Sequence, residues 1–64
     1  MHDELLRLPT AAEAIGHGET TTRRLIREGR LRAVLVDGVL RVPRSAIDEF
    51  IASLPEAHPG ADLS

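Results

Sequence analysis

The side chains best suited to chemistry in this sequence are its arginines. The 64-residue chain has eight arginines and no lysine, and seven of the arginines lie between residues 20 and 44. With Glu28 and Asp37, this segment carries a net charge of +5, whereas residues 1–19 sum to −3 and residues 45–64 to −4. A guanidinium group is planar and donates paired hydrogen bonds to a phosphate or to the O6 and N7 edge of guanine. A basic centre between acidic ends therefore indicates a surface that attracts a polyanion, although the whole chain has a charge of −2.

Residue types that catalyse reactions or bind metals are scarce. The chain has no cysteine, and its three histidines, His2, His17 and His58, lack the spacing of metal ligands. We find no Ser, His and Asp set and no glycine-rich phosphate loop, and we expect no pocket of useful size in so short a chain. The neighbouring carboxylates Asp48 and Glu49 are interpreted as a solvated helix face. The sequence therefore favours a binding protein without cofactor or metal over an enzyme.

The hydrophobic composition limits the classes of ligand and the cellular location that we expect for this protein. Phe50 is the only aromatic residue, so no ring is expected at the surface for an unpaired base to stack on. Double-stranded nucleic acid is therefore favoured over a single strand. The longest apolar runs are far shorter than the roughly 20 residues that span a bilayer, and no charged and apolar leader opens the chain. We expect a cytoplasmic protein that does not bind membranes.

The first predicted element is a short helix at about residues 9–15. Pro9 suits the first turn of a helix, where its missing N–H costs nothing, and Gly16 ends the apolar periodicity as a terminating glycine does. Thr10 and Glu13 also match a capping box, which would move the start by one or two residues.

A second helix is predicted at about residues 19–28. Gly18 is an acceptable N-cap, and Gly29 ends the pattern. The inward stripe is formed by Thr22, Leu25 and Ile26, and Leu31 is expected to pack just beyond the end. Two short helices joined by a tight glycine turn are typical of the helix-turn-helix arrangement.

In the next segment, the spacing of the apolar residues changes from that of a helix to that of a strand. Asp37 and Gly38 stand between two runs rich in Val and Leu, which predicts a hairpin with a type I′ turn, and Pro43 ends its second strand. A third helix is predicted from Arg44 or Ser45 to Pro55. Its apolar face is expected to consist of Ala46, Ile47, Phe50, Ile51 and Leu54.

The order helix, helix, hairpin, helix predicts a mainly α fold with a small β-hairpin, a winged helix-turn-helix. We expect this domain to occupy residues 6–54, after a flexible N-terminus at residues 1–5. Residues 55–64 combine Pro, Gly and acidic side chains without apolar periodicity and are interpreted as a disordered acidic tail.

The outer face of the second helix carries the predicted binding residues. Opposite the inward stripe, the helix presents two hydroxyl and three guanidinium side chains: Thr20, Thr21, Arg23, Arg24 and Arg27. In a helix-turn-helix, the N-terminal residues of the second helix contact base edges in the major groove. The alternative is a merely solvated face, on which Glu28 would pair with Arg24 at i, i+4.

Four further arginines extend the basic surface toward the hairpin and are predicted to contact the wing side and the phosphate backbone: Arg30, Arg32, Arg41 and Arg44. The predicted helix at residues 9–15 and the hairpin both flank this one face, which favours double-stranded nucleic-acid binding over the solvated alternative.

Three ordered segments resemble the excisionase-type, MerR-like winged helix-turn-helix DNA-binding domain: AAEAIG (11–16), RRLIREGRLRAV (23–34) and RVPRSAIDEFI (41–51). The resemblance covers about residues 6–54. It implies major-groove contacts by the five side chains of the second helix named above. It also implies a wing contact by Arg41.

Three positions depart from the family pattern. His17 stands where an apolar residue is usual, so the turn is expected to pack less well. Thr22 replaces the usual valine, which makes the core under the second helix more polar. Asp37 at the apex leaves the wing less basic than usual, which argues against deep insertion into the minor groove.

The resemblance implies a small sequence-specific factor that binds and bends double-stranded DNA, such as an excisionase or recombination directionality factor that assists a site-specific integrase. The same domain also serves small transcriptional regulators and antitoxins, so the fold does not decide between these roles. A protein-interaction module, whose arginine face meets an acidic partner, is a third alternative. We expect a nucleoid-associated protein, monomeric in solution, that assembles cooperatively on adjacent DNA sites.

Overall fold

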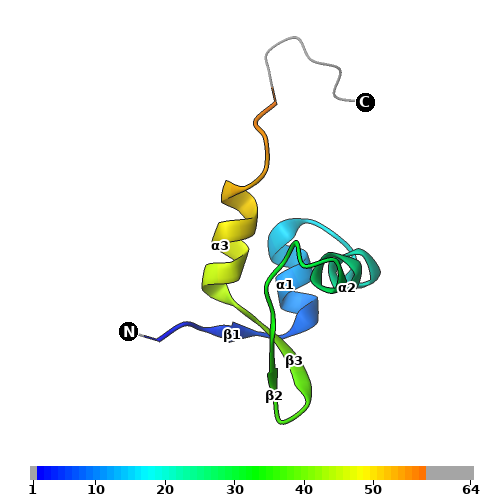
Figure 1. Ribbon diagram of the computed structural model, residues 1–64, viewed down its shortest axis with the longest axis vertical. Coiled ribbons are helices and arrows are strands. Elements are labelled where there is room, and N and C mark those ends of the chain that lie inside the picture. The colour runs from blue at the N-terminus through cyan, green and yellow to red at the C-terminus, as the bar shows by residue number, and fades with distance from the viewer. Residues whose placement is uncertain (1, 58–64) are drawn as a thin grey trace.

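The chain folds in the order strand, helix, helix, hairpin, helix in the computed structural model, which describes residues 2–57 (Figure 1). Within these residues there are three helices and one three-stranded antiparallel sheet of order β1-β3-β2. The winged helix-turn-helix expected from the sequence is confirmed. The bounds are β1 Leu5–Leu6, α1 Leu8–Ile15, α2 Glu19–Arg27, β2 Val34–Val36, β3 Val39–Pro43 and α3 Arg44–Ala52.

A glycine turn joins α1 to α2. Gly16 ends α1 with a left-handed φ of 74°, and the His17 N–H donates to the Ala12 carbonyl at 3.0 Å. This pattern satisfies carbonyls that the helix end leaves open, and glycine adopts the left-handed region without a steric penalty. The predicted bounds of both helices agree with the structure to within one residue. Because α1 already begins at Leu8, the later start suggested by the capping box at Thr10 is wrong.

The hairpin forms in the predicted register. Val36 pairs with Val39 and Leu35 with Leu40 across the turn. Asp37 has a φ of 52° and Gly38 a φ of 79°, and two positive values in succession are what a type I′ turn requires. We call this hairpin, β2 with β3, the wing.

The strand β1 was not expected. Leu5 pairs with Pro43, and Leu6 pairs with Val42 and is buried. We had expected residues 1–5 to be a flexible N-terminus, but Leu5 belongs to the sheet and the Glu4 carbonyl accepts a hydrogen bond from the Arg44 N–H at 2.7 Å. The expectation failed because a strand of two residues is too short to show a period of its own.

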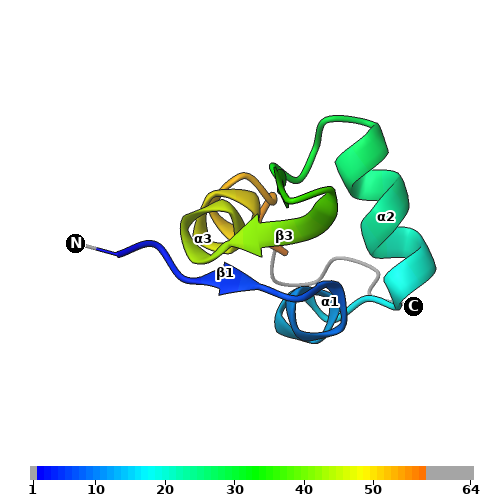
Figure 2. The ribbon, with the colours of Figure 1, turned by 90° about the horizontal axis from the view of Figure 1, so that it is seen from below.

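The core lies between α1, α2, α3 and the sheet. Its buried side chains come from every part of the fold: Leu6, Ala11, Leu25, Leu31, Val42, Ala46, Ile47 and Phe50. Figure 2 shows α1 and α3 end-on while α2 runs across the view, so α2 crosses the other two helices steeply. This crossing leaves one long side of α2 facing away from the core.

Two residues predicted for the apolar face of α3 are exposed instead. Ala46, Ile47 and Phe50 are buried, but the side chains of Ile51 and Leu54 remain about half exposed. Ile51 lies at the edge of the buried stripe, and Leu54 follows the end of the helix at Ala52. Of the predicted acidic tail, residues 55–57 are exposed without regular structure, and residues 58–64, including His58, lie outside the described residues.

Candidate nucleic-acid interface

The outer face of α2 presents the side chains that the sequence predicted. Thr20, Arg23, Arg24 and Arg27 are exposed, and Thr21 is half-buried at the edge. The inward stripe is also as expected, because Thr22 and Leu25 are buried and Ile26 is half-buried. The helix is therefore divided sharply into an apolar side and an arginine-bearing side.

Thr22 occupies the core without leaving its hydroxyl unpaired. The side chain is fully buried, and its Oγ1 donates to the Gly18 carbonyl at 2.8 Å. A buried hydroxyl without a partner would be costly, whereas a bond to the carbonyl four residues earlier removes that cost. The more polar core expected under α2 is thus present and satisfied, and the contact is made at the N-terminal turn of the helix that carries the arginines.

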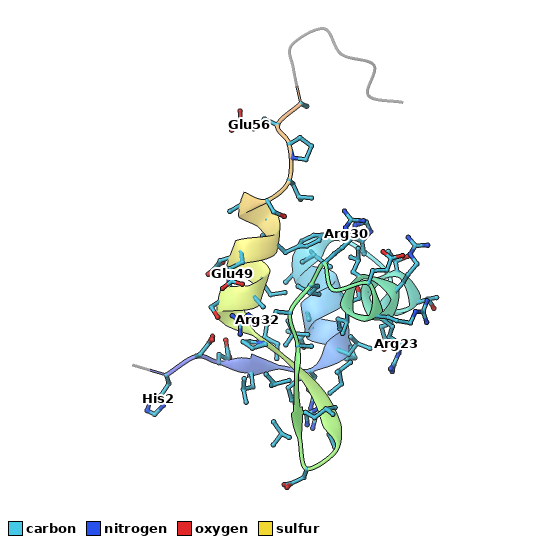
Figure 3. All side chains as sticks on the ribbon, viewed as in Figure 1. His2, Arg23, Arg30, Arg32, Glu49 and Glu56 are labelled. Carbon is cyan, nitrogen blue, oxygen red and sulfur yellow. The ribbon has the colours of Figure 1, made fainter. Side chains whose placement is uncertain are left out.

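The guanidinium groups of α2 have no acidic partner within the described residues. The proposed pair between Arg24 and Glu28 does not form, since Arg32 with Glu49 is the one ion pair within 4 Å in residues 2–57. In Figure 3 the Arg23 side chain extends outward from α2, away from the core. Its charge and its hydrogen-bond donors remain available to a ligand.

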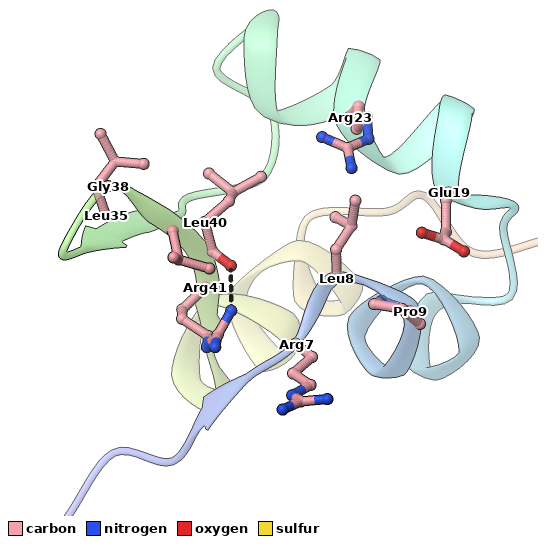
Figure 4. Close-up of a pocket in the computed structure, with 10 residues that line it drawn as sticks. Arg7, Leu8, Pro9, Glu19, Arg23, Leu35, Gly38, Leu40 and Arg41 are labelled. Carbon is pink, nitrogen blue, oxygen red and sulfur yellow. Dashed lines mark hydrogen bonds between the residues drawn. The ribbon is translucent and has the colours of Figure 1, made fainter.

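An open hollow lies beside this face, between the start of α1, the start of α2 and the wing (Figure 4). Its volume is about 600 Å³, and it is a depression open to solvent, not an enclosed cavity. Three arginines and one glutamate contribute to its lining, and the other lining residues are uncharged. We call it the wing hollow, and its charged residues are Arg7, Glu19, Arg23 and Arg41.

The wing hollow brings together residues that the sequence analysis treated separately. Arg41 is half-buried on β3, where its Nη1 donates to the Leu40 carbonyl at 3.0 Å (Figure 4). Arg7, directly before α1, also lines the hollow, although it is not among the predicted binding residues because the sequence places it in the acidic N-terminal segment. The sequence does carry one indication of this position. Arg7 directly precedes Leu8 and Pro9 at the start of α1, and the first residues of α1 lie close to the start of α2 in a helix-turn-helix.

Arg32 is engaged elsewhere. Its Nε and Nη2 donate to the two carboxylate oxygens of Glu49 at 3.3 and 3.1 Å, and Nη2 also donates to Ser45 Oγ at 2.9 Å. Figure 3 shows Arg32 beside α3 and Glu49. The hydrogen bonds to Glu49 and the charge of Glu49 raise the pKa of Arg32. Asp48 and Glu49 are both exposed, as predicted, and Glu49 also pairs with Arg32.

The same cluster caps α3. Pro43 at the N-cap position supplies no side-chain hydrogen bond, and the N–H of Ser45 donates instead to Asp3 Oδ1 at 3.0 Å. The Ser45 hydroxyl donates to Asp3 Oδ2 at 2.5 Å. The hydrogen bonds from Ser45 lower the pKa of Asp3, with a smaller contribution from the charge of Arg32. A carboxylate beside a helix N-terminus satisfies open N–H groups there and complements the helix dipole.

The last two predicted arginines are exposed and separate from the wing hollow. Arg30 follows α2, where its N–H donates to the Leu25 carbonyl at 2.9 Å and its side chain projects into solvent (Figure 3). Arg44 opens α3. The structure therefore groups Arg23 and Arg41 at one site, with Arg24 and Arg27 farther along α2, and leaves Arg30, Arg32 and Arg44 apart from them.

Two further kinds of feature concern the described part of the chain, clusters of metal-ligating side chains and membrane-spanning helices. Residues 2–57 contain no group of three or more His, Cys, Asp or Glu side chains that could hold a metal ion. None of the helices described has the length and apolar character needed to cross a membrane.

Comparison with known proteins agrees with this geometry. Residues 5–55 match the family model described as "Helix-turn-helix domain". The chain belongs to this family. A curated protein of Saccharopolyspora erythraea named "Probable excisionase" is 38% identical over 50 residues, which are 78% of this chain and 51% of that protein. No solved structure gives a significant match.

The helix-turn-helix chain is thus an excisionase-type DNA-binding domain. It spans about half the length of the curated relative. The resemblance predicted from the sequence segments is confirmed.

Proposed function

We propose that this helix-turn-helix protein binds a specific double-stranded DNA site and acts as an excisionase, a recombination directionality factor that bends DNA to assist a site-specific integrase. The observation that carries the proposal is the outer face of α2, where three exposed arginines have no acidic partner within residues 2–57. The name of the similar S. erythraea protein favours excision over the roles of transcriptional regulator and antitoxin.

The proposed recognition element is α2. Placed in the major groove, it would direct Thr20, Arg23 and Arg24 to base edges from its first two turns. Arginine pairs with guanine O6 and N7, and threonine hydroxyls accept or donate to either base of a pair. Thr21 would contact the edge of the same groove, and Arg27 would contact its far end. This division gives sequence selectivity to the N-terminal half of the helix.

Backbone contacts are proposed for the surrounding arginines. Arg41 on the wing, Arg30 after α2 and Arg44 at the start of α3 are each placed where a phosphate could approach without displacing an internal ion pair. Arg32 would have to give up Glu49 to bind DNA, so we expect it to contribute least of the predicted residues. Phosphate contacts of this kind orient a protein on the duplex but carry no sequence information.

The proposed assembly follows from the small size of the domain. One α2 helix reads only a few base pairs, so selectivity for one site needs several copies on adjacent sequences. We propose a monomer in solution that assembles cooperatively on DNA in the nucleoid, where it would meet the integrase.

Selection of bound duplexes from a randomised library tests the proposal, followed by a recombination assay with the integrase of the same element. We expect one enriched sequence, bending of that site in a circular-permutation assay, and faster excision but not faster integration. Enrichment without any effect on excision would contradict the excisionase role and leave a regulator. Recovery of random sequences would contradict sequence-specific binding altogether.

A further inference from the structure

The wing hollow combines positive charge with apolar walls. Arg7, Arg23 and Arg41 lie around it with one opposing carboxylate, Glu19, which leaves a net charge of +2. Leu35, which is exposed, and Leu40, which is half-buried, contribute apolar surface to the same lining. A ligand that fits must therefore be anionic on one side and apolar on another.

Three guanidinium groups around the hollow keep donors free. Arg7 and Arg23 make no side-chain hydrogen bond or ion pair within residues 2–57, and Arg41 uses one nitrogen for the Leu40 carbonyl. The backbone of Arg7 is held independently, because its carbonyl accepts from the Ala11 N–H at 2.9 Å. Its side chain is therefore not needed for that contact and is available to a ligand.

The position of the hollow favours a polymeric anion over a small free anion. It adjoins the first turn of α2 and the wing, and it is open, so a continuous polymer that follows α2 can pass through it. A phosphodiester supplies the anionic oxygens, and the deoxyribose beside it supplies an apolar surface for Leu35 and Leu40. A small free anion would use the arginines but would leave the apolar walls without a partner.

We propose that the wing hollow seats one phosphodiester step of a single strand of duplex DNA, with Arg7 and Arg41 as the contacts to that phosphate. Arg23 lines the α2 side of the hollow and keeps its proposed contact with a base edge. This inference rests on the proposed DNA binding and names the part of the strand that the hollow receives. Glu19 opposes the phosphate in the same hollow and lowers the affinity. Arg7 is thereby a binding residue that lies outside both α2 and the wing.

The test is a scan of a bound duplex with single methylphosphonate substitutions, each of which removes one phosphate charge. The Arg7→Gln protein keeps the backbone bond to Ala11 and is first shown to fold by circular dichroism. We expect Arg7→Gln to weaken binding to the unmodified duplex roughly three- to tenfold. At one phosphate or two adjacent phosphates, the methylphosphonate and the substitution together should cost no more than either alone. Arg41→Gln should show the same non-additivity at the same place.

A pair of glutamates provides a control of opposite sign. Glu19→Gln should tighten binding at low salt, whereas Glu28→Gln, exposed at the other end of α2 and not lining the hollow, should tighten it less. Equal effects of the two substitutions would overturn the placement of the phosphate.

The outcomes separate this inference from the proposed function. If the unaltered protein binds duplex DNA but the loss from Arg7→Gln adds to every methylphosphonate, the hollow does not hold a phosphate and the proposed function stands. If the unaltered protein binds no duplex, the proposed function fails, and this inference fails with it.

Discussion

Two regions of the molecule use arginine in opposite ways. On α2, Arg23, Arg24 and Arg27 are exposed and form no ion pair within the described residues. Beside α3, Arg32 donates to both oxygens of Glu49 and to the hydroxyl of Ser45. The first region leaves charge free for a ligand, and the second uses charge to hold the N-terminal strand, the entry to the wing and α3 together.

The difference shows why a count of basic residues overstates the binding surface. The net +5 of residues 20–44 includes Arg32, whose charge is matched by Glu49 outside that segment. Arg7 is the opposite case, because the charge of its segment is negative although Arg7 itself lines the wing hollow with Arg23 and Arg41. Local pairing, and not position in the sequence, decides which arginines can meet a phosphate.

The largest effect is expected from Arg23→Ala and Arg24→Ala. Each bidentate contact to a base contributes about 1–3 kcal/mol of discrimination, so each substitution should reduce the preference for the selected site over random DNA by that amount. Fluorescence anisotropy titrations with both duplexes measure the preference. Arg30→Ala is the matched control, and it should weaken both duplexes alike. Equal losses on both duplexes from all three substitutions would show that α2 is only a charged surface.

Gly38→Val tests the wing, which connects the two regions. A β-branched residue resists the φ of 79° at Gly38, and we expect a loss of about 1–3 kcal/mol in the free energy of unfolding. Within residues 2–57 and apart from the two chain neighbours of Gly38, no heavy atom lies within 4 Å of an added Cβ, so backbone strain and not a clash is the cause. Gly38→Asn is the control because asparagine tolerates the left-handed region. Urea denaturation should show a smaller loss for Asn, and similar losses for the two variants would argue against the strained turn.

Arg32→Gln should separate stability from recognition. Loss of the contacts with Glu49 and Ser45 should lower the Tm by less than Gly38→Val does, because the ion pair is solvent-exposed. The ratio of specific to random DNA binding should stay unchanged. Glu49→Gln should lower the Tm similarly, and the double variant should lose less than the sum of the two. A clear loss of discrimination in Arg32→Gln would mean that Arg32 leaves Glu49 to read DNA.

A smaller, pH-dependent effect is expected at Asp3. The pKa of Asp3 is lowered in the folded protein, so its contribution to stability is present above the unfolded value of about 3.9. It is lost as the pH falls through the lower folded pKa. Asp3→Asn should therefore reduce the Tm at pH 7, and the difference from the unaltered protein should shrink on acidification below about pH 4. A difference that is constant from pH 7 to pH 3 would show that the carboxylate is not responsible.

The smallest effect is expected at the wing tip. Asp37→Asn keeps a residue that tolerates the φ of 52° and removes a negative charge at the apex. If the tip approaches a phosphate, binding at low salt should tighten by up to about twofold, and the gain should vanish at high salt. Asp48→Asn on α3 is the control for a general charge effect. An equal gain from both variants would place the tip away from the DNA.

Local features of this fold could be predicted from the sequence because each depends on nearby residues. The spacing of Thr22 and Leu25 marked the buried side of α2, and Asp37 with Gly38 marked the type I′ turn. Gly16 marked the end of α1. In these cases the chemistry of one or two residues, their periodicity or their tolerance of positive φ, determines the backbone within a few positions.

Features that depend on tertiary contacts were missed. The pairing of Leu5 and Leu6 with β3, and the capping of α3 by Asp3, join residues about forty positions apart. The pair Arg32–Glu49 spans 17 positions, and nothing in either local sequence distinguishes it from a solvated pair of charges. Arg7 became a candidate only when the fold placed the start of α1 beside α2 and the wing. Its role and those of the other predicted contact residues stay predictions.

The salt dependence of duplex binding tests most directly the claim that a basic surface in an acidic chain binds DNA through its phosphates. Binding constants of the unaltered protein for the selected duplex are measured between about 50 and 200 mM salt. If the exposed arginines neutralise about four to six phosphates, the slope of log K against log salt is roughly −4 to −5. A slope near zero would contradict the account, because the arginines of α2 and the wing hollow would then not be releasing counterions from DNA.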